Sequence, residues 1–414
     1  MIEDINENDS VFDKILEPAL PLVEEQSRKL KPHHNEKLYF KAFFRLLIFY
    51  FLRKSIPSAK VFICSLLNKG VLSPELNLLQ ISYTAFIEAS DRFSPELFKA
   101  VFQGLILTVS LQSVPEIAAF GPLICVDGSL FPTIKSMMQA DYKKNKNAVR
   151  LHLCFELNRM ITVDIAVGSG NSGERSAMRK MLVNGSTYIA DRGYFSFDLF
   201  HDILKAKACF IIRVKSNLVF TSVESFPVQM PDKVKSLFKL VTDDLICCKN
   251  DLHESLYRLV RFRACGEIFY IMTDRMELTT FQVIMLYSYR WLVELLFRFF
   301  KHTMKGLHII RHTVDGITIQ FYAILITSLL LLKLKQDILI QSESIESVNS
   351  KEELNSQQSD AQFYNKSKPY QFFNMIGDKI DKYWKIGIHW LSVLQEILAK
   401  PFNDWAFNVL SGLS

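Results

Sequence analysis

The sequence has few cysteines, and their spacing fits neither a zinc site nor a disulfide framework. The 414 residues include seven cysteines, none of which forms a C-x-x-C pair or a paired spacing with histidine. Most of them lie in apolar, strand-like runs, where a free cysteine behaves as a small hydrophobic residue. We therefore expect no zinc centre and no disulfides, and a reducing compartment.

The sequence also lacks a secretory signal pattern and a clear membrane span. Its first ten residues, MIEDINENDS, are acidic and polar, unlike the basic and apolar start of a signal peptide. Two apolar runs stand out, but 40–52 contains Lys41 and Arg45, and 316–332 contains Gln320. Because a spanning helix needs about 20 mostly apolar residues, both runs predict buried core helices and no membrane partner.

No strong excess of charge identifies a partner. The formal net charge is +6, a mild basic excess that suits an anionic partner without naming one. The length allows two or three domains of roughly 100–200 residues each. Hydrophobic residues make up 49%, which supplies a sizeable core.

The predicted elements change character along the chain. Helical spacing dominates the first part, and short apolar strands alternating with helices follow from about residue 120. This order predicts an α/β core with a mixed central sheet. The expected divisions are an N-terminal helical region (1–115), the core (116–215 and 276–337), a β-rich insertion (216–275), a polar linker (338–368) and a C-terminal helical region (369–414).

Within the core, several elements can be placed from their patterns. Apolar runs at 148–157 and 160–168 flank Asn158-Arg159 and predict a hairpin. Further along, the sequence predicts helices at 174–182, 197–205 and 278–307, and strands that end at Asp191 and near Lys215.

Two aspartates share an unusual setting. Asp127 and Asp191 each follow a short apolar stretch and precede a glycine-containing turn, DGS and DRG. A carboxylate at a buried strand end is costly to keep ionised without a partner, so shared cations would explain both. Capping of the following turn by each side chain explains them equally well at this point.

One face of the predicted helix near residue 290 combines a single acid with several cations. At about 100° per residue, Glu294 and the residues beside it lie within about 60° of Tyr287. The residues on this face are Tyr287, Arg290, Glu294, Arg298, Lys301 and Lys305. Pairs spaced four residues apart would account for part of this charge, whereas the surplus of cations suits a phosphate-rich ligand. Trp291, near the edge of the face, could stack on a base or pack internally.

The spacing Y-x-x-R-x-x-x-E-x-x-x-x-x-x-K, matched by Tyr287, Arg290, Glu294 and Lys301, resembles a known family signature. It resembles that of the DDE cut-and-paste transposases of bacterial insertion sequences, in the insertion-sequence-four group. VDGSLF around Asp127 and ADRGYF around Asp191 resemble the first and second acidic motifs of that family, in the right order. The resemblance covers about residues 120–335.

The resemblance implies a ribonuclease-H-like core in which Asp127, Asp191 and Glu294 bind two Mg²⁺ ions, with Mn²⁺ able to substitute. Carboxylates are the ligands that such hard cations prefer, and two ions can promote phosphoryl transfer. The expected function is a cytoplasmic, nucleoid-associated transposase that binds terminal inverted repeats and target DNA as a homodimer, cleaves DNA and transfers strands. The N-terminal helical region would contribute to DNA binding, and a set of side chains would hold DNA phosphates: Tyr287, Arg290, Arg298, Lys301 and Lys305.

The resemblance leaves some features open. Relatives extrude a base onto an aromatic side chain, often a tryptophan of the insertion, but residues 216–275 contain no tryptophan. Phe220, Tyr257 or Phe262 would have to substitute, so a hairpin intermediate is undecided.

Several other polar residues lie near these motifs in the sequence. Arg192 could neutralise the acids or contact DNA, and His152 is expected to be a core residue. A basic stretch could contact DNA or form a solvated loop: Lys143, Lys144, Lys146 and Arg150.

Two other functions remain open from the sequence. One is a catalytically silent or co-opted DNA-binding relative, and the other is a ribonuclease-H-type nuclease without strand transfer. Cleavage of a DNA end in Mn²⁺ separates the first from a transposase, and joined products separate the second.

Overall fold

The computed structural model describes residues 11–31, 38–52, 56–67, 80–108, 115–133, 141–143, 146–264, 266–302 and 307–352. The described residues up to 108 pack with those from 299 to 352 as one compact unit, and residues 115–298 form a second. The predicted C-terminal helical region, 369–414, lies outside the described residues. So does most of the predicted linker, 338–368.

The first unit is helical, as the spacing of its apolar residues predicts. Phenylalanines fill its core: Phe43 is fully buried and stacks on Phe93, with ring centroids 5.5 Å apart. The run at 40–52 is a buried helix, which confirms that prediction. The elements are α1 (Val11–Leu16), η1 (Glu17–Ala19), α2 (Leu20–Arg28), α3 (Phe40–Leu52), α4 (Ala59–Leu67), α5 (Tyr83–Arg92), α6 (Pro95–Thr108) and α12 (Val314–Glu352).

Helix α12 differs from the expectation in two ways. It contacts α3, α5 and α6, so it belongs to the helical unit, whereas the sequence places residues up to 337 with the α/β core. It also continues to Glu352, so the first part of the predicted polar linker is helical. Residues 338–352 contain neither glycine nor proline, which allows a helix begun in the apolar segment to continue.

One stretch of α12, Val314–Leu334, is long and apolar enough to cross a membrane by length and composition. Among the described residues it is the one helix of this kind. Most of the stretch is buried within the protein, as a core helix would be.

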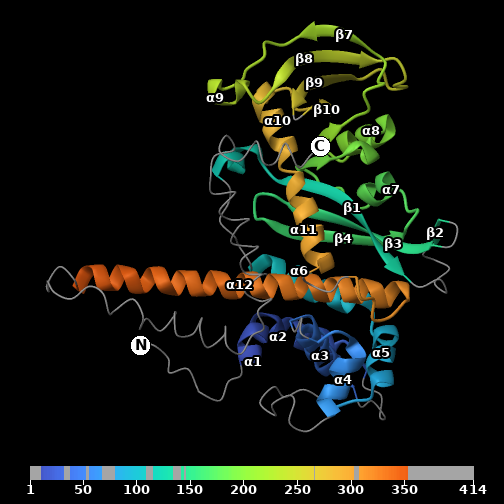
Figure 1. Ribbon diagram of the computed structural model, residues 1–414, viewed down its shortest axis with the longest axis vertical. Helices are drawn as coiled ribbons and strands as arrows, with labels where there is room; N and C mark the ends of the chain where they lie inside the picture. Colours follow the sequence, from blue (N-terminus) through green and yellow to red (C-terminus); the bar gives the residue numbers. More distant parts are fainter. Residues whose placement is uncertain are drawn as a thin grey trace. The chain divides into compact units, whose positions relative to one another are not determined.

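The second unit is built on one mixed sheet of ten strands (Figure 1). The strand order is β2-β3-β1-β5-β6-β10-β9-β8-β7, and β4 pairs with β3. Strand β5 is parallel to β1 and β6, while the remaining pairs are antiparallel. The strands are β1 (Leu123–Thr133), β2 (Asp141–Lys143), β3 (Lys146–Glu156), β4 (Ile161–Ser169), β5 (Thr187–Ala190), β6 (Cys209–Arg213), β7 (Phe220–Ser225), β8 (Lys239–Cys248), β9 (Leu256–Ala264) and β10 (Glu267–Thr273).

Several predicted core elements are confirmed. The hairpin is β3–β4, the strand that ends before Asp191 is β5, and the strand predicted near Lys215 is β6. The mixed α/β class is also confirmed. The remaining elements of this unit are η3 (Pro115–Phe120), α7 (Glu174–Arg179), η5 (Arg192–Tyr194), α8 (Phe197–Lys205), α9 (Asp232–Lys235), α10 (Thr280–Ser288) and α11 (Trp291–His302), the last of which extends into the helical unit.

The strands of the expected β-rich insertion extend the core sheet instead of forming a separate one. Strand β10 pairs directly with β6, through Ile271 opposite Arg213 and Thr273 opposite Ile211. This pairing satisfies backbone groups that would otherwise be exposed at the edge of β6. A continuous sheet therefore connects residues 216–275 to the strands that carry the acids.

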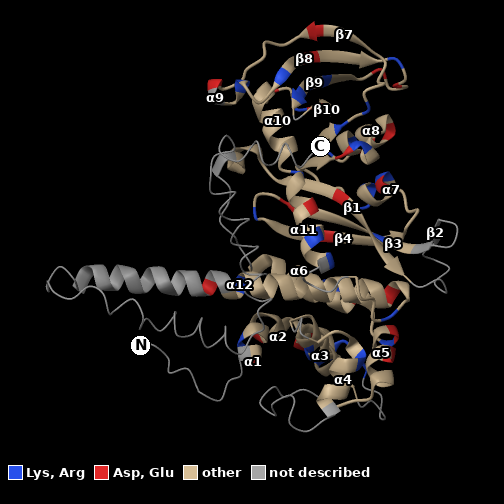
Figure 2. Ribbon diagram, viewed as in Figure 1, with Lys and Arg blue, Asp and Glu red and all other residues tan. Residues whose placement is uncertain are grey.

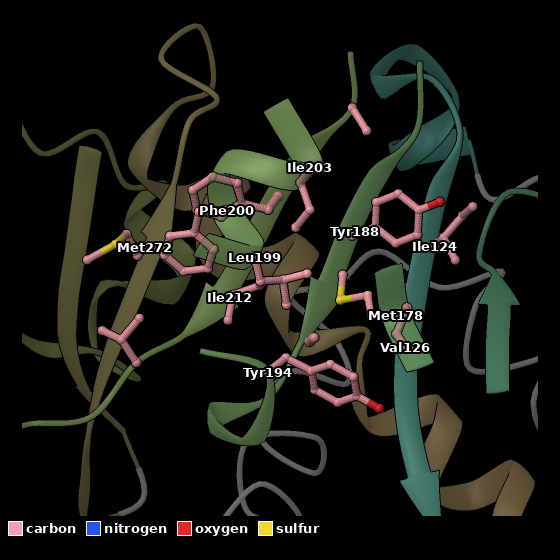
Figure 3. Packing of buried hydrophobic residues seen from close by; sticks show 14 of the residues in the cluster. Ile124, Val126, Met178, Tyr188, Tyr194, Leu199, Phe200, Ile203, Ile212 and Met272 are labelled. Atoms are coloured by element: carbon pink, nitrogen blue, oxygen red, sulfur yellow. The ribbon is translucent and has the colours of Figure 1, made fainter. Parts of the chain in front are cut away.

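The two faces of the sheet have different coverings. Alternate residues of β1, β5 and β6, such as Val126, Ala190 and Ile212, pack with α7 and α8 (Figure 3). Because successive residues of a strand point to opposite faces, Asp127 after Val126 points away from this cluster. Helix α10 contacts β5, β6, β9 and β10. Tyr287 of α10 lies beside Phe269, which β10 directs away from the α7–α8 cluster.

A buried ion pair fixes the start of α10. Arg258 of β9 donates to both carboxylate oxygens of Asp243 of β8, at 2.8 and 2.6 Å, and both side chains are almost fully buried. Arg258 also donates to the Leu278 carbonyl oxygen at 2.5 Å, and the Thr280 hydroxyl donates to Asp243 at 2.7 Å. A capping box of Thr279 and Gln282 then begins the helix.

We expect Arg258→Ala to lower the free energy of unfolding by about 3–5 kcal/mol, because it leaves the Asp243 carboxylate buried and unpaired. Urea unfolding measures this loss. Lys235→Ala, which breaks the exposed Lys235–Asp232 pair, is the matched control and should leave the midpoint unchanged. Equal midpoints for Arg258→Ala and the wild type would contradict the structural role of the pair.

Candidate functional site

Asp127 and Asp191 are brought together by neighbouring parallel strands. Val126 of β1 pairs with Ala190 of β5, so the next residue of each strand starts from the same level of the sheet. Strand β5 ends at Ala190, and Asp191 begins the turn into η5. The order of strands in the sheet therefore places side by side two aspartates that are far apart in the sequence.

Glu294 joins these aspartates through Arg290. The Arg290 guanidinium donates to Glu294 Oε1 at 2.8 Å and to Asp127 Oδ2 at 3.5 Å. The Tyr287 hydroxyl donates to Asp191 Oδ1 at 3.3 Å. Two side chains near the α10–α11 junction thus connect all three acids, and β1 and α11 both carry acidic positions in Figure 2.

The junction is a break that the sequence does not predict. One uninterrupted helix over 278–307 was the expectation, and this is wrong: α10 ends at Ser288, and α11 begins at Trp291. Between them, the Arg290 amide donates to the Tyr287 carbonyl at 3.1 Å, and the Leu292 amide donates to the Tyr289 carbonyl at 3.0 Å. These bonds connect residues that are three apart in the sequence, and they tighten the turn. Tyr287 therefore contacts Asp191 from α10, whereas Glu294 contacts Arg290 from α11.

Burial makes the charge on Asp127 costly. Burial raises the pKa of Asp127 to about 6, with smaller contributions in the same direction from Glu294 and Asp191. Arg290 and the Gly128 amide, which donates to Asp127 at 2.7 Å, oppose this rise in pKa. A carboxyl group whose pKa remains raised beside an arginine is still short of positive charge.

The two partner side chains are themselves buried. Tyr287 is 0% exposed, and burial raises its pKa to about 12, so it stays protonated and donates a hydrogen bond. Burial on its own would lower the pKa of Arg290, but Tyr287 and the carboxylates of Asp127, Asp191 and Glu294 outweigh it and raise the pKa. Arg290 therefore remains a cation at neutral pH.

Two of the other residues expected to bind phosphate, Arg298 and Lys301, lie on α11. Arg298 of α11 is exposed and makes no ion pair with any described residue. Trp291 and Lys301 are half-buried, and Lys305 lies outside the described residues. DNA contact by these residues stays a prediction.

A second polar cluster lies beside Asp127, and the sequence does not predict it. Arg150 of β3 donates to Glu174 of α7 at 2.6 Å. The Glu174 carboxylate occupies the space that a side chain at Gly193 would need, which explains the glycine of the DRG turn. The pattern identifies Glu174 only as a helix start, because the contact with Gly193 depends on the fold.

His152 lies within the same cluster as a buried residue, which agrees with the expectation. Its Nε2 atom lies 3.2 Å from Ser172 Oγ, and its Nδ1 atom lies 3.5 Å from the Tyr194 hydroxyl. Burial, and next the charge of Arg150, lower the pKa of His152 to about 4. The imidazole is therefore neutral at pH 7. Arg192 is exposed, and the side chains of Lys143, Lys144 and Lys146 lie outside the described part.

Two of the aromatic residues proposed to stack on an extruded base are inaccessible. Tyr257 and Phe262 are each 1% exposed. Phe220 is half-buried, with the Arg261 guanidinium 5.5 Å from its ring centre. Of the three, Phe220 alone keeps an accessible surface.

The acids have a donor set suited to divalent cations. Among the described residues, no group of three His, Cys, Asp or Glu side chains is close enough to hold a metal ion. Instead, the Arg290 guanidinium contacts both Asp127 and Glu294. Three carboxylates nevertheless provide the oxygen ligands that Mg²⁺ prefers, and the raised pKa of Asp127 shows that further positive charge would be stabilising there.

A comparison of the sequence with protein families finds one family model that matches. The model described as the transposase DDE domain matches residues 118–330, just over half of the chain. The chain therefore belongs to the transposase DDE domain family.

Two relatives have transposase names. "Putative transposase y4zB" of Sinorhizobium fredii is 25% identical over 211 residues, which cover 50% of this chain and 59% of the relative. "Probable transposase for insertion sequence element IS5377" of Geobacillus stearothermophilus is 21% identical over 265 residues, 63% of this chain and 69% of the relative. The chain thus spans less than two thirds of the first relative.

In metal-free buffer, we expect Asp127→Asn to stabilise the protein at pH 7, because asparagine cannot carry the buried charge. The pKa of Asp127 is about 6 in the folded protein, against 3.8 for an ordinary aspartate in the unfolded chain, a difference that corresponds to roughly 3 kcal/mol at most. The folded state binds the extra proton between these two values. The advantage of the variant should therefore shrink as pH falls through 6 and vanish below about 4.

Thermal unfolding of both proteins from pH 4 to 8 measures this difference. Asp198→Asn, which alters an exposed acid of α8, is the control. A destabilised Asp127→Asn protein at pH 7 would show that the charge of Asp127 is already well compensated.

Proposed function

We propose that the protein is a metal-dependent DNA transposase that binds the inverted repeats at element ends, cleaves DNA and transfers the cut strands. The observation that carries this proposal is the convergence of Asp127, Asp191 and Glu294 on the α10–α11 junction. Membership of the transposase DDE domain family supports it. The spacing of Tyr287, Arg290, Glu294 and Lys301 resembles the signature of the insertion-sequence-four group, and this resemblance favours that group within the family.

The proposed catalytic core is ribonuclease-H-like. The mixed sheet supports this reading, since Asp127 and Asp191 are carried by the neighbouring strands β1 and β5, and α11 carries Glu294. The proposed cofactor is a pair of Mg²⁺ ions held by Asp127, Asp191 and Glu294, for which Mn²⁺ would substitute. Such ions activate the attacking oxygen and stabilise the leaving oxygen during phosphoryl transfer.

The remaining side chains of the site would hold DNA. Arg290 has the planar donor fork that suits phosphate oxygens, and exposed Arg298 on the same chain segment is accessible to a DNA backbone. Tyr287, Lys301 and Lys305 complete the proposed set of phosphate contacts. Trp291, which is half-buried, would stack on a base.

The proposed partners are the double-stranded ends of the element and target DNA, bound by a homodimer in the cytoplasm. A name that refers to an insertion sequence element, carried by one relative, supports this substrate. The N-terminal helices would contribute to DNA binding. Within α5, Phe86, Ala89 and Ser90 are buried, so any contact with DNA would use the other residues of that helix.

The test uses a plasmid that carries the DNA flanking the gene. We expect Asp127→Ala, Asp191→Ala and Glu294→Ala each to reduce Mg²⁺-dependent cleavage by at least about a thousandfold, because each removes a metal ligand. DNA binding, measured by mobility shift, should persist. Asp198→Ala is the control, since that carboxylate is exposed on α8 and should leave cleavage unchanged.

Each alternative function has its own outcome in this assay. Wild-type protein that binds DNA but does not cleave it in Mn²⁺ would indicate a silent DNA-binding relative. Nicked DNA without joined products would indicate a nuclease. Full cleavage by Glu294→Ala would exclude the proposed site.

A further inference from the structure

Arg290 occupies an unusual position for a side chain expected to bind DNA. It is 4% exposed and lies between two of the acids, with a hydrogen bond of 2.8 Å to Glu294. Its contact with Asp127, at 3.5 Å, is longer than the roughly 2.7–2.9 Å of a strong charged hydrogen bond. Arg290 Nε is buried and has no hydrogen-bond partner among the described residues.

These contacts describe a cation that is held but incompletely satisfied. A buried guanidinium with an unpaired N–H group loses hydrogen-bond energy that a better acceptor would restore. Asp127 and Glu294 also share a single guanidinium, while the Gly128 amide donates to Asp127 and the Tyr287 hydroxyl donates to Asp191. Arg290 is thus the main positive charge that balances the acids in this state.

A metal ion at the acids would meet this charge at short range. Like charges a few ångströms apart repel strongly where water is excluded. The carboxylates of Asp127 and Glu294 would interact more weakly with Arg290 while they coordinate a metal ion. Binding of a divalent ion therefore competes with the two contacts that Arg290 makes.

We propose that Arg290 is an internal counter-ion that competes with the divalent metal for Asp127 and Glu294, and that a DNA phosphate raises metal affinity by drawing Arg290 away. The inference rests on the proposed function. It adds an order of events at the site, because Arg290 would neutralise the acids before DNA binds and would hold a DNA phosphate afterwards.

Arg290 is not part of either helix. It lies in the two-residue turn between α10 and α11, outside both helices. The long contact to Asp127 is the weaker of its two ion pairs and would be released first. The five N–H groups of a guanidinium match phosphate oxygens, so the exchange could satisfy the Nε–H group that has no partner among the described residues.

Reciprocity follows from this coupling. If phosphate binding raises the affinity for metal, then metal must raise the affinity for phosphate by the same factor. If Arg290 served DNA binding alone, any coupling through direct contact of the metal with phosphate would persist when Arg290 is replaced.

The test is calorimetric titration of the full-length protein with Mn²⁺ in the absence of DNA. We expect Arg290→Gln to bind Mn²⁺ about tenfold or more tightly than the wild type, because its competitor is gone. Arg290→Lys keeps the charge and should remain near the wild type. Lys205→Gln removes an exposed charge of α8, which lies on the other face of the sheet, and should leave the affinity for Mn²⁺ unchanged.

A second titration adds a short DNA duplex of mixed sequence. Wild-type protein should then bind Mn²⁺ more tightly than without DNA, while Arg290→Gln should gain little. Equal or weaker Mn²⁺ binding by folded Arg290→Gln in the absence of DNA would overturn the inference. If Arg290→Gln does not fold, the absence of a gain from DNA in the wild type overturns it instead.

Asp127→Asn distinguishes a failure of the proposed metal site from a failure of the proposed competition by Arg290. If this variant loses Mn²⁺ affinity but Arg290→Gln does not gain it, the metal site stands and the competition fails. If Asp127→Asn and the wild type bind Mn²⁺ equally, or neither binds it, both the proposed function and the inference fail.

Discussion

The negative charge at half-buried Asp127 is the constraint on which the site depends. Strand β1 carries this carboxylate to a position where partial loss of water makes its ionised form unfavourable, and Asp191 and Glu294 add to the cost. The structure compensates with one arginine and one tyrosine, neither of which is exposed. A site that concentrates acids beyond what its own cations can neutralise is suited to binding metal ions, and the stability lost in the metal-free state would be recovered when they bind.

The rest of the fold positions the side chains that respond to this charge. Strands β8 and β9 hold Asp243 and Arg258, which fix Leu278 and Thr280 at the start of α10. Helix α10 then delivers Tyr287 and the turn that contains Arg290. The strands between β6 and α10 therefore have a structural role in the site in addition to any contact with DNA. Because they continue the core sheet, the position of Arg290 depends on pairing between distant parts of the chain.

Much of the core could be predicted from local pattern. The β3–β4 hairpin follows from two apolar runs around Asn158-Arg159, and the helix at 197–205 follows from its spacing. The two aspartates follow from the apolar stretches before them, and Asp191 does come after its strand. The strand end and turn expected at Asp127 are wrong, because β1 continues through it to Thr133 and pairs with β3 along that length. The break at Tyr289–Arg290 could not be predicted, because it contains neither proline nor glycine. In the fold, Arg290 contacts Asp127 and Glu294 from this turn. The fit of Glu174 over Gly193 and the packing of α12 with the N-terminal helices likewise depend on tertiary contacts.

The central claim is that Asp127, Asp191 and Glu294 hold divalent metal together, and metal-directed cleavage of the protein tests it most directly. With added hydrogen peroxide and ascorbate, Fe²⁺ bound in place of Mg²⁺ is oxidised to Fe³⁺ as it reduces peroxide to hydroxide and a hydroxyl radical. The radical cuts the backbone next to the ion, and ascorbate then restores Fe²⁺. The account predicts fragments that end near residues 127, 191 and 294, with all three cuts suppressed together by excess Mg²⁺. Cleavage at other positions, or cuts at one of these positions that Mg²⁺ does not suppress, would contradict it.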